Sequence, residues 1–400
     1  MGIKKENIDL ASLSMCVLML ISLFVPGFMT FSKSRVNMPD PVSAKVLFGG
    51  SFYIVVAAVF VLVVLSVVKG KSGLLNFITG AFSNIFLISV MLMTNFSYDR
   101  IPYDKTDMSR MSFGLGFVLM VIALYGINVL TESYITNRWM KYVNRYLVWL
   151  IVFGLVAAGF MDNYSVMKEY AANSRTFMRY LNGHISLCVK ALTLSILIGV
   201  PTGYWCYSRR VADRVIMFII SIFETMPMLA LFAIIRIPCN ALGESIPALK
   251  SFGVGNHGLS VSVIALTIYG LYLIISNSRA AFTVVDKDYK EVASALGMSP
   301  LKIFFRIQLP LALPVVLTGI RLAMISTITS AALAAFFVGG GLGQYINLGT
   351  NGSALDLQLL AVIPIFVLTV AADLIMRVVI YLIRYLTGGK TTNGRIAEAV

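Results

Sequence analysis

The sequence predicts an all-α protein that crosses the lipid bilayer about ten times. Hydrophobic residues make up 58% of its 400 residues and charged residues only 12%, and the mean hydropathy is +0.86. A soluble chain of this length needs more charge to cover its surface. The same composition excludes a disordered chain, and the small number of cysteines, 4, excludes a disulfide-stapled fold.

Ten apolar stretches are long enough to cross the hydrocarbon as helices, which takes about 20 residues each. They are continuous rather than alternating, which argues against a transmembrane β-barrel. The first is interpreted as a retained helix, because no small-residue cleavage site follows it and further spans come at once. The expected spans are 11–29, 47–68, 74–94, 111–131, 143–161, 185–208, 211–237, 258–281, 311–337 and 357–385.

The basic residues predict the orientation of these spans. With the N-terminus in the cytoplasm, the intervals facing the cytoplasm hold most of the 32 lysines and arginines. An even number of spans then places the C-terminus in the cytoplasm too. The net charge of +14 is therefore explained by membrane topology, and we expect a lipid bilayer and no nucleic acid as partner.

No motif for catalysis, metal binding or nucleotide binding appears. The chain has neither paired cysteines nor histidines at zinc spacing. Gly70-Lys71-Ser72 resembles the end of a phosphate-binding loop, but Leu65 stands where the first glycine of that loop belongs. We therefore expect no catalytic residue, no metal and no cofactor bound by this chain, and any ATP to be used by a separate ATPase.

The polar segment 282–310, between two spans, carries the clearest local pattern. Asp286 or Asp288 can cap a helix that has a narrow apolar stripe, and Gly297 can end that helix in a left-handed conformation. Ser299 suits the N-cap of a second helix with Pro300 at its first position, and this helix is expected to stop before Pro310. An ordinary interfacial amphipathic helix is the simpler alternative.

Two ionisable residues are predicted deep in the membrane, where a charge costs roughly 2.5–3.5 kcal/mol and needs a partner or a wet surface. Glu224 and Arg321 lie at similar depths in spans that start inside, and we expect them to face each other or the translocation path. Glu224 could meet a quaternary ammonium group with Tyr269 or Tyr272. The alternatives are a structural ion pair and a neutral glutamic acid. Pro227 lies nearby and would kink its span.

The spacing within 282–310 resembles the coupling-loop signature of ABC importer permeases, E-A-A-x3-G-x9-I-x-L-P. The matching residues are Glu291, Ala293, Gly297, Ile307, Leu309 and Pro310, and only Val292 departs from the signature. In that family the loop inserts into a cleft of the ATPase subunit. The resemblance implies the same coupling role here, with Glu291 and Gly297 as key positions.

The resemblance extends from about residue 181 to 385, where the chain is similar to permeases of osmoprotectant importers. The stretches that carry it are 195–203, 224–231, 309–314 and 339–343, with Glu224 and Met228 in place of the family's Gln and Ser. Segments 161–170 and 353–357 are similar to the YehY-like subgroup, which has an extended N-terminal half. The expected domains are an N-terminal membrane extension of about five helices (1–162), an extracytoplasmic connector (163–183), a five-helix type I (MetI-like) permease core (184–386) and a cytoplasmic tail (387–400).

This resemblance implies a multi-pass permease of the bacterial cytoplasmic (inner) membrane. It would import glycine betaine, choline or related amines by alternating access, together with an ATP-binding subunit, an extracytoplasmic substrate-binding protein and a second permease, identical or different. One alternative is the same machinery importing another small solute, such as an amino acid. The other is an ion-coupled secondary transporter that works alone, although the sequence shows no inverted repeat.

Overall fold

The computed structural model describes residues 10–34, 39–68, 72–101, 103, 109–246, 259–285, 287–336 and 340–386. Within these residues, nine helical segments are long and apolar enough to cross a membrane, and α1 is apolar but only 15 residues long. The prediction of an all-α protein with about ten membrane helices is confirmed. The expected tail 387–400 and the first nine residues lie outside the described residues. The chain divides into two compact units, 1–172 and 173–400.

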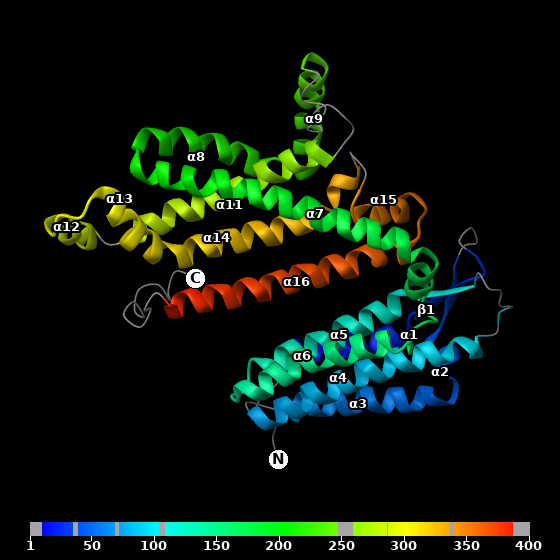
Figure 1. Ribbon diagram of the computed structural model, residues 1–400. Coiled ribbons are helices and arrows are strands. Elements are labelled where there is room, and N and C mark those ends of the chain that lie inside the picture. The colour runs from blue at the N-terminus through cyan, green and yellow to red at the C-terminus, as the bar shows by residue number, and fades with distance from the viewer. Residues whose placement is uncertain are drawn as a thin grey trace. The chain divides into compact units, whose positions relative to one another are not determined.

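The described residues of the first unit form six α-helices, two short 3₁₀ turns and three short strands (Figure 1). The elements are α1 (Leu10–Phe24), β1 (Met29–Ser32), β2 (Asp40–Val42), α2 (Ala44–Phe48), η2 (Gly49–Ser51), α3 (Phe52–Val68), α4 (Gly73–Phe96), η3 (Ser97–Arg100), β3 (Arg110–Phe113), α5 (Leu115–Glu132) and α6 (Arg138–Ala157).

The small sheet corrects the expected spans 11–29 and 111–131. Helix α1 ends at Phe24, ahead of Pro26, because proline offers no N–H and disfavours helical geometry in the residue before it. The chain then enters β1, which lies between β2 and β3 in an antiparallel sheet, with Met29 opposite Val42 and Phe31 opposite Met111.

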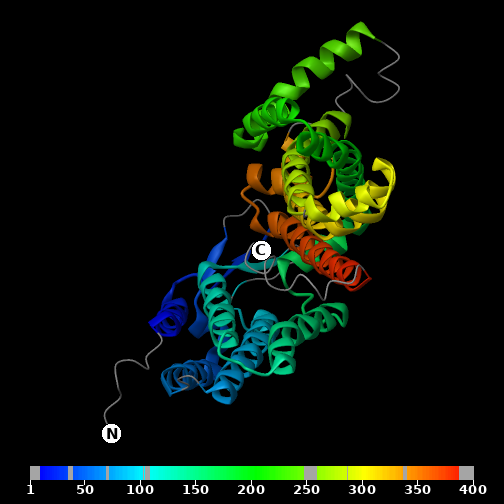
Figure 2. The same cartoon turned by 90° about the vertical axis from the view of Figure 1, so that its left-hand side faces the viewer.

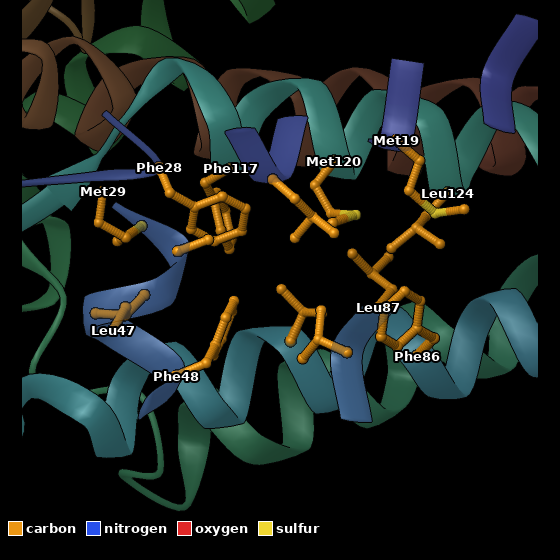
Figure 3. Close-up of a cluster of buried hydrophobic side chains, with 14 of the residues drawn as sticks. Met19, Phe28, Met29, Leu47, Phe48, Phe86, Leu87, Phe117, Met120 and Leu124 are labelled. Carbon is orange, nitrogen blue, oxygen red and sulfur yellow. The ribbon is translucent and has the colours of Figure 1, made fainter. Parts of the chain in front are cut away.

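A dense apolar core holds the first unit together, as Figure 3 shows. The ring of Phe28 packs edge-on against those of Phe48 and Phe117, at centroid distances of 5.4 and 6.1 Å. Met19, Met120 and Leu124 continue this core between α1 and α5. Edge-to-face rings at these distances are favourable, so the core fixes how the strands join the helices.

A ring of three asparagine side chains joins α4, α5 and α6 inside the first unit. The amide of Asn84 donates to Asn144 Oδ1 (3.2 Å), that of Asn144 to Asn128 Oδ1 (3.2 Å), and that of Asn128 to Asn84 Oδ1 (2.5 Å). Asn128 and Asn144 are buried. Each amide therefore has a partner, as buried polar groups between membrane helices require.

The second unit is a bundle of long helices, of which α7, α11, α14 and α16 run side by side in Figure 1. Helix α9 points away from the rest of this unit in both views (Figures 1 and 2). The elements are α7 (Ser165–Ser208, which begins in the first unit), α8 (Arg210–Thr225), α9 (Met228–Ser245), α11 (Leu259–Val284), α12 (Lys287–Ala295), α13 (Pro300–Ile303), a π-helical turn η4 (Phe304–Gln308), α14 (Leu309–Ser330), η5 (Leu333–Phe336), α15 (Gly343–Asn351) and α16 (Leu355–Leu386). A non-helical Asn173 bends α7 near the border of the units.

Small residues allow α7 and α11 to pack closely. A Cβ atom on Gly203 would lie 2.5 Å from Ser278 Cβ and 2.9 Å from the carbonyl oxygen of Ile275, and one on Gly199 would lie 2.7 Å from Ile274 Cγ2. One turn earlier, Ser195 occupies the space beside Gly270. The hydrophobic effect does not drive helices together within lipid. Close packing of the two backbones, as seen here, is therefore a main source of helix–helix affinity.

Candidate functional site

The polar segment between α11 and α14 forms the predicted helix, turn and second helix. Helix α12 ends at Ala295, and Gly297, two residues later, has a left-handed φ of 75°. Gly297 N–H donates to the Ser294 carbonyl (2.9 Å) and Met298 N–H to the Ala293 carbonyl (3.1 Å). These two bonds are those of a Schellman motif, which satisfies carbonyls at the end of a helix. The predicted glycine turn is confirmed.

Ser299 and Pro300 begin the next helix as predicted, but that helix does not stop before Pro310. The π-helical turn η4 joins α13 directly to α14, with Leu309 N–H bonded to the Phe304 carbonyl. Proline in a regular α-helix removes one hydrogen bond and crowds the carbonyl four residues earlier. The wider π turn shifts the backbone hydrogen bonds by one residue, so the helix continues past Pro310 into the membrane.

The six residues of the signature divide into exposed and packed positions. Glu291 is exposed on α12, whereas Ala293 on the same helix is buried. Ile307, Leu309 and Pro310 are half-buried, and Leu309 packs against the core shared by α11 and α14. Ala293 and Gly297 therefore shape the loop, and Glu291 faces outward.

The outer surface of this loop is apolar, and none of the segments that the structure describes covers it. Tyr289, Val292 and Leu296 are 59%, 60% and 77% exposed, and their spacing of three and four residues puts them on one face of α12. These residues, with Ala293 and Ile307 among others, line a hollow of about 390 Å³. An exposed apolar patch with a hollow is typical of a surface that binds another protein.

The expected single span 211–237 is wrong, because Met226 and Pro227 interrupt it. Helix α8 ends at Thr225, Met226 is extended, and Pro227 precedes the first residue of α9. Since Pro227 has no N–H to donate, the helix cannot continue through it without losing a bond. Glu224 is therefore exposed in the last turn of α8, next to a break between two helices.

The structure brings the carboxylate of Glu224 near the hydroxyl of Tyr272 on α11. Tyr269 lies one turn earlier on α11 and is half-buried, as is Tyr272. The side chains of Glu224 and Tyr272 place an anionic group beside an aromatic hydroxyl at the break. A carboxylate and tyrosine faces are the groups that bind organic cations.

Arg321 is paired with Asp373 rather than with Glu224. Arg321 Nε donates to Asp373 Oδ1 at 2.5 Å, and Arg377 Nε donates to Oδ2 of the same carboxylate at 2.8 Å. The side chains of Arg321 and Asp373 are 22% and 19% exposed. This cluster joins α14 to α16, and the sequence had not indicated Asp373 as the partner.

No group of three or more His, Cys, Asp or Glu side chains in the described parts of the chain could hold a metal ion. The candidate surfaces of the second unit are the loop around α12 and the helix break at Pro227.

Known families match both halves of the chain. The family described as "Binding-protein-dependent transport system inner membrane component" matches residues 195–385, and "ABC transporter permease YehY, N-terminal domain" matches residues 9–167. The choline transport system permease protein OpuBB of Bacillus subtilis is 33% identical over 196 residues, which are 47% of this chain and 83% of that protein. The chain belongs to the family of ABC importer permeases. This permease is thus a multi-pass inner-membrane transport component rather than an enzyme.

Other relatives also match about half of the permease. The carnitine transport permease protein OpuCB of Listeria monocytogenes is 30% identical, over 52% of this chain and 88% of its own. Among solved structures, a chain of the methionine ABC transporter MetNI in an inward-facing conformation is 18% identical, covers 52% of this chain and 95% of that chain, and has a TM-score of 0.45. The loop around α12 and the Pro227 break both lie within residues 195–385.

Proposed function

We propose that this permease forms the membrane path of an ATP-driven importer for small quaternary amines such as glycine betaine, choline or carnitine. The relatives named for choline and carnitine transport support this substrate class, because the permease covers most of their length. The carboxylate of Glu224 beside Tyr272 suits the same class, since quaternary ammonium groups bind acidic and aromatic side chains. Pro227, Tyr269 and Arg321 are further candidates for the translocation path.

The observation that carries the proposal is the loop around α12. Its signature residues Glu291, Ala293 and Gly297 lie in a helix and its glycine turn, and its outer face is apolar and exposed among the described residues. That face would bind the separate ATPase subunit. Because coupling requires contacts that differ between two states, ATP binding would move the loop and switch the path between inward- and outward-facing forms.

The remaining partners follow from this arrangement. A second permease subunit, identical or different, would complete the path, and a substrate-binding protein would deliver the substrate at the outer face. Both termini of the permease would lie in the cytoplasm, as the distribution of lysine and arginine indicates.

Transport in proteoliposomes tests the proposal. The permease would be reconstituted with its ATPase and binding protein, and uptake of radiolabelled glycine betaine and choline would be measured with ATP or a non-hydrolysable analogue inside. We expect uptake only with ATP and the ATPase. Uptake that persists without the ATPase would instead indicate an ion-coupled transporter, and ATP-driven uptake of amino acids alone would reject the substrate class.

The substrate role of Glu224 has its own test. Glu224→Gln removes the charge but keeps the shape, and we expect the KM for glycine betaine uptake to rise at least tenfold. Glu244→Gln is the matched control, because Glu244 is also exposed but lies at the far end of α9. Unchanged uptake by Glu224→Gln at normal membrane abundance would remove Glu224 from the substrate path.

A further inference from the structure

Lys290 on α12 has a contact that the coupling signature does not include. Its ammonium group donates a hydrogen bond to the hydroxyl of Tyr207, 83 residues earlier in the chain. Tyr207 lies in the last turn of α7, just before the turn into α8. Helix α12 otherwise packs mainly against α13 and η4, which follow it directly in sequence. The contact from Lys290 to Tyr207 therefore connects the loop to a membrane helix that is distant in sequence.

The ammonium nitrogen of Lys290 lies close to both the hydroxyl and the ring of Tyr207. Lys290 Nζ is 4.6 Å from the centroid of the Tyr207 ring and is bonded to the hydroxyl oxygen. A charged donor strengthens such a hydrogen bond roughly twofold over a neutral one. The hydroxyl, and not the ring alone, is thus the group that holds the lysine.

Tyr207 in turn belongs to an aromatic cluster that joins the two membrane helices α7 and α11 to the loop. Its ring is 6.0 Å from that of Tyr204 and 6.1 Å from that of Phe282 on α11. Phe304 in η4 completes the cluster, with centroids 4.7 Å from Tyr204 and 5.9 Å from Phe282. Each packed ring pair adds contact energy beyond its buried area. Separating the ends of α7 and α11 from η4 would lose this energy, which favours their moving together.

An ion pair joins α11 to α8 at the same end of the helix bundle. Arg279 on α11 lies 2.6 Å from Asp213 on α8. The ends of α7 and α11, the beginning of α8 and the loop therefore meet in one place, where Figure 1 shows α12 and α13 beside the ends of these helices. Lys290 faces this cluster, while Tyr289 and Val292 on the same helix face outward.

We infer that Lys290 and Tyr207 form a link that transmits movement of the coupling helix α12 to the end of α7. This inference rests on the proposed function, because it assigns to these residues a share in coupling to the ATPase. Neither residue would touch the ATPase or the substrate. Both are positioning residues: they make α12 and α7 move as one body, so that an ATP-driven shift of the loop reaches the translocation path.

The test compares uptake with ATP hydrolysis in the reconstituted full complex. Lys290→Met and Tyr207→Phe both remove the hydrogen bond, and the phenylalanine keeps the ring in its cluster. We expect each variant to bind the ATPase and hydrolyse ATP within about twofold of the unaltered complex, while glycine betaine uptake per ATP falls at least fivefold. Lys290→Arg keeps a charged donor and should recover most of this ratio. Lys302→Met is the control, because Lys302 is an exposed lysine of the same loop.

A double variant decides between a link and two separate effects. Lys290→Met with Tyr207→Phe should be no worse than either single change, because both remove the same bond. The inference would be overturned if the loss of uptake per ATP in the double variant equalled the product of the two single losses. It would also be overturned if the single variants kept an unchanged ratio of uptake to ATP hydrolysis, or if they lost ATPase binding in parallel with uptake. These outcomes are distinct from a failure of the proposed function, in which the unaltered complex itself would show no ATP-dependent uptake.

Discussion

Gly343 leaves no room for a side chain, because a Cβ atom there would overlap the carbonyl oxygen of Ala332. We predict that Gly343→Ala lowers the free energy of unfolding by about 1–3 kcal/mol or more, as overpacking of a rigid interior does. Gly154→Ala is the control, since nothing lies within 4 Å of its Cβ position on α6. Thermal unfolding of both purified variants in detergent measures the difference, and equal melting temperatures would contradict the prediction.

Asp373 is a second residue on which local structure depends, because one carboxylate serves both Arg321 and Arg377. We predict that Asp373→Asn destabilises the permease by up to about 3 kcal/mol, less than a fully buried pair would lose because both side chains are partly exposed. The double variant Arg321→Leu, Asp373→Leu should regain most of that stability, since it no longer leaves the partly buried Arg321 cation without an anion. Uptake by the double variant then shows whether Arg321 has a role in transport: normal uptake would make the pair purely structural.

At the scale of a secondary-structure element, the turn after α12 depends on the backbone of Gly297. Its φ of 75° is disfavoured for residues with a Cβ, and most strongly for β-branched ones. We predict that Gly297→Val costs about 1–2 kcal/mol locally and reduces co-purification of the ATPase, whereas Gly297→Asn retains most of it. Because no atom lies within 4 Å of the Cβ position, a steric clash would not explain the loss. Equal co-purification of both variants would contradict the proposed role of the turn.

The sequence predicted this loop well because local chemistry determines it. Glycine, serine and proline at 297, 299 and 300 fix backbone angles within a few residues. The partners of Arg321 and Lys290 lie 52 and 83 residues away in the chain, so they follow from tertiary packing and not from spacing.

Two prolines show why element boundaries were harder to predict. Pro227 ends a helix inside one apolar run, whereas Pro310 is absorbed by a π turn. Hydropathy alone does not distinguish these outcomes. The short strands β1 to β3 were missed because three or four residues carry too weak a pattern within apolar surroundings.

At the scale of the whole molecule, the two units have separate apolar cores. The core around Phe48 contains only residues of the first unit, and the core around Phe282 contains only residues of the second. The asparagine ring adds polar bonds that are confined to the first unit. We therefore expect the two units to unfold as distinct cooperative parts, as units with independent cores do.

Matched core substitutions test this independence. Phe48 and Phe282 are both almost fully buried, at 0% and 1% exposure, and replacing such a ring by alanine typically costs about 3–5 kcal/mol. We predict that Phe48→Ala lowers one transition in scanning calorimetry and Phe282→Ala lowers the other. A single transition that shifts equally in both variants would mean that the units unfold together. If the units are independent, Phe48→Ala should also leave the ATP-dependence of uptake unchanged below its own transition, because the proposed coupling loop and path lie in the second unit.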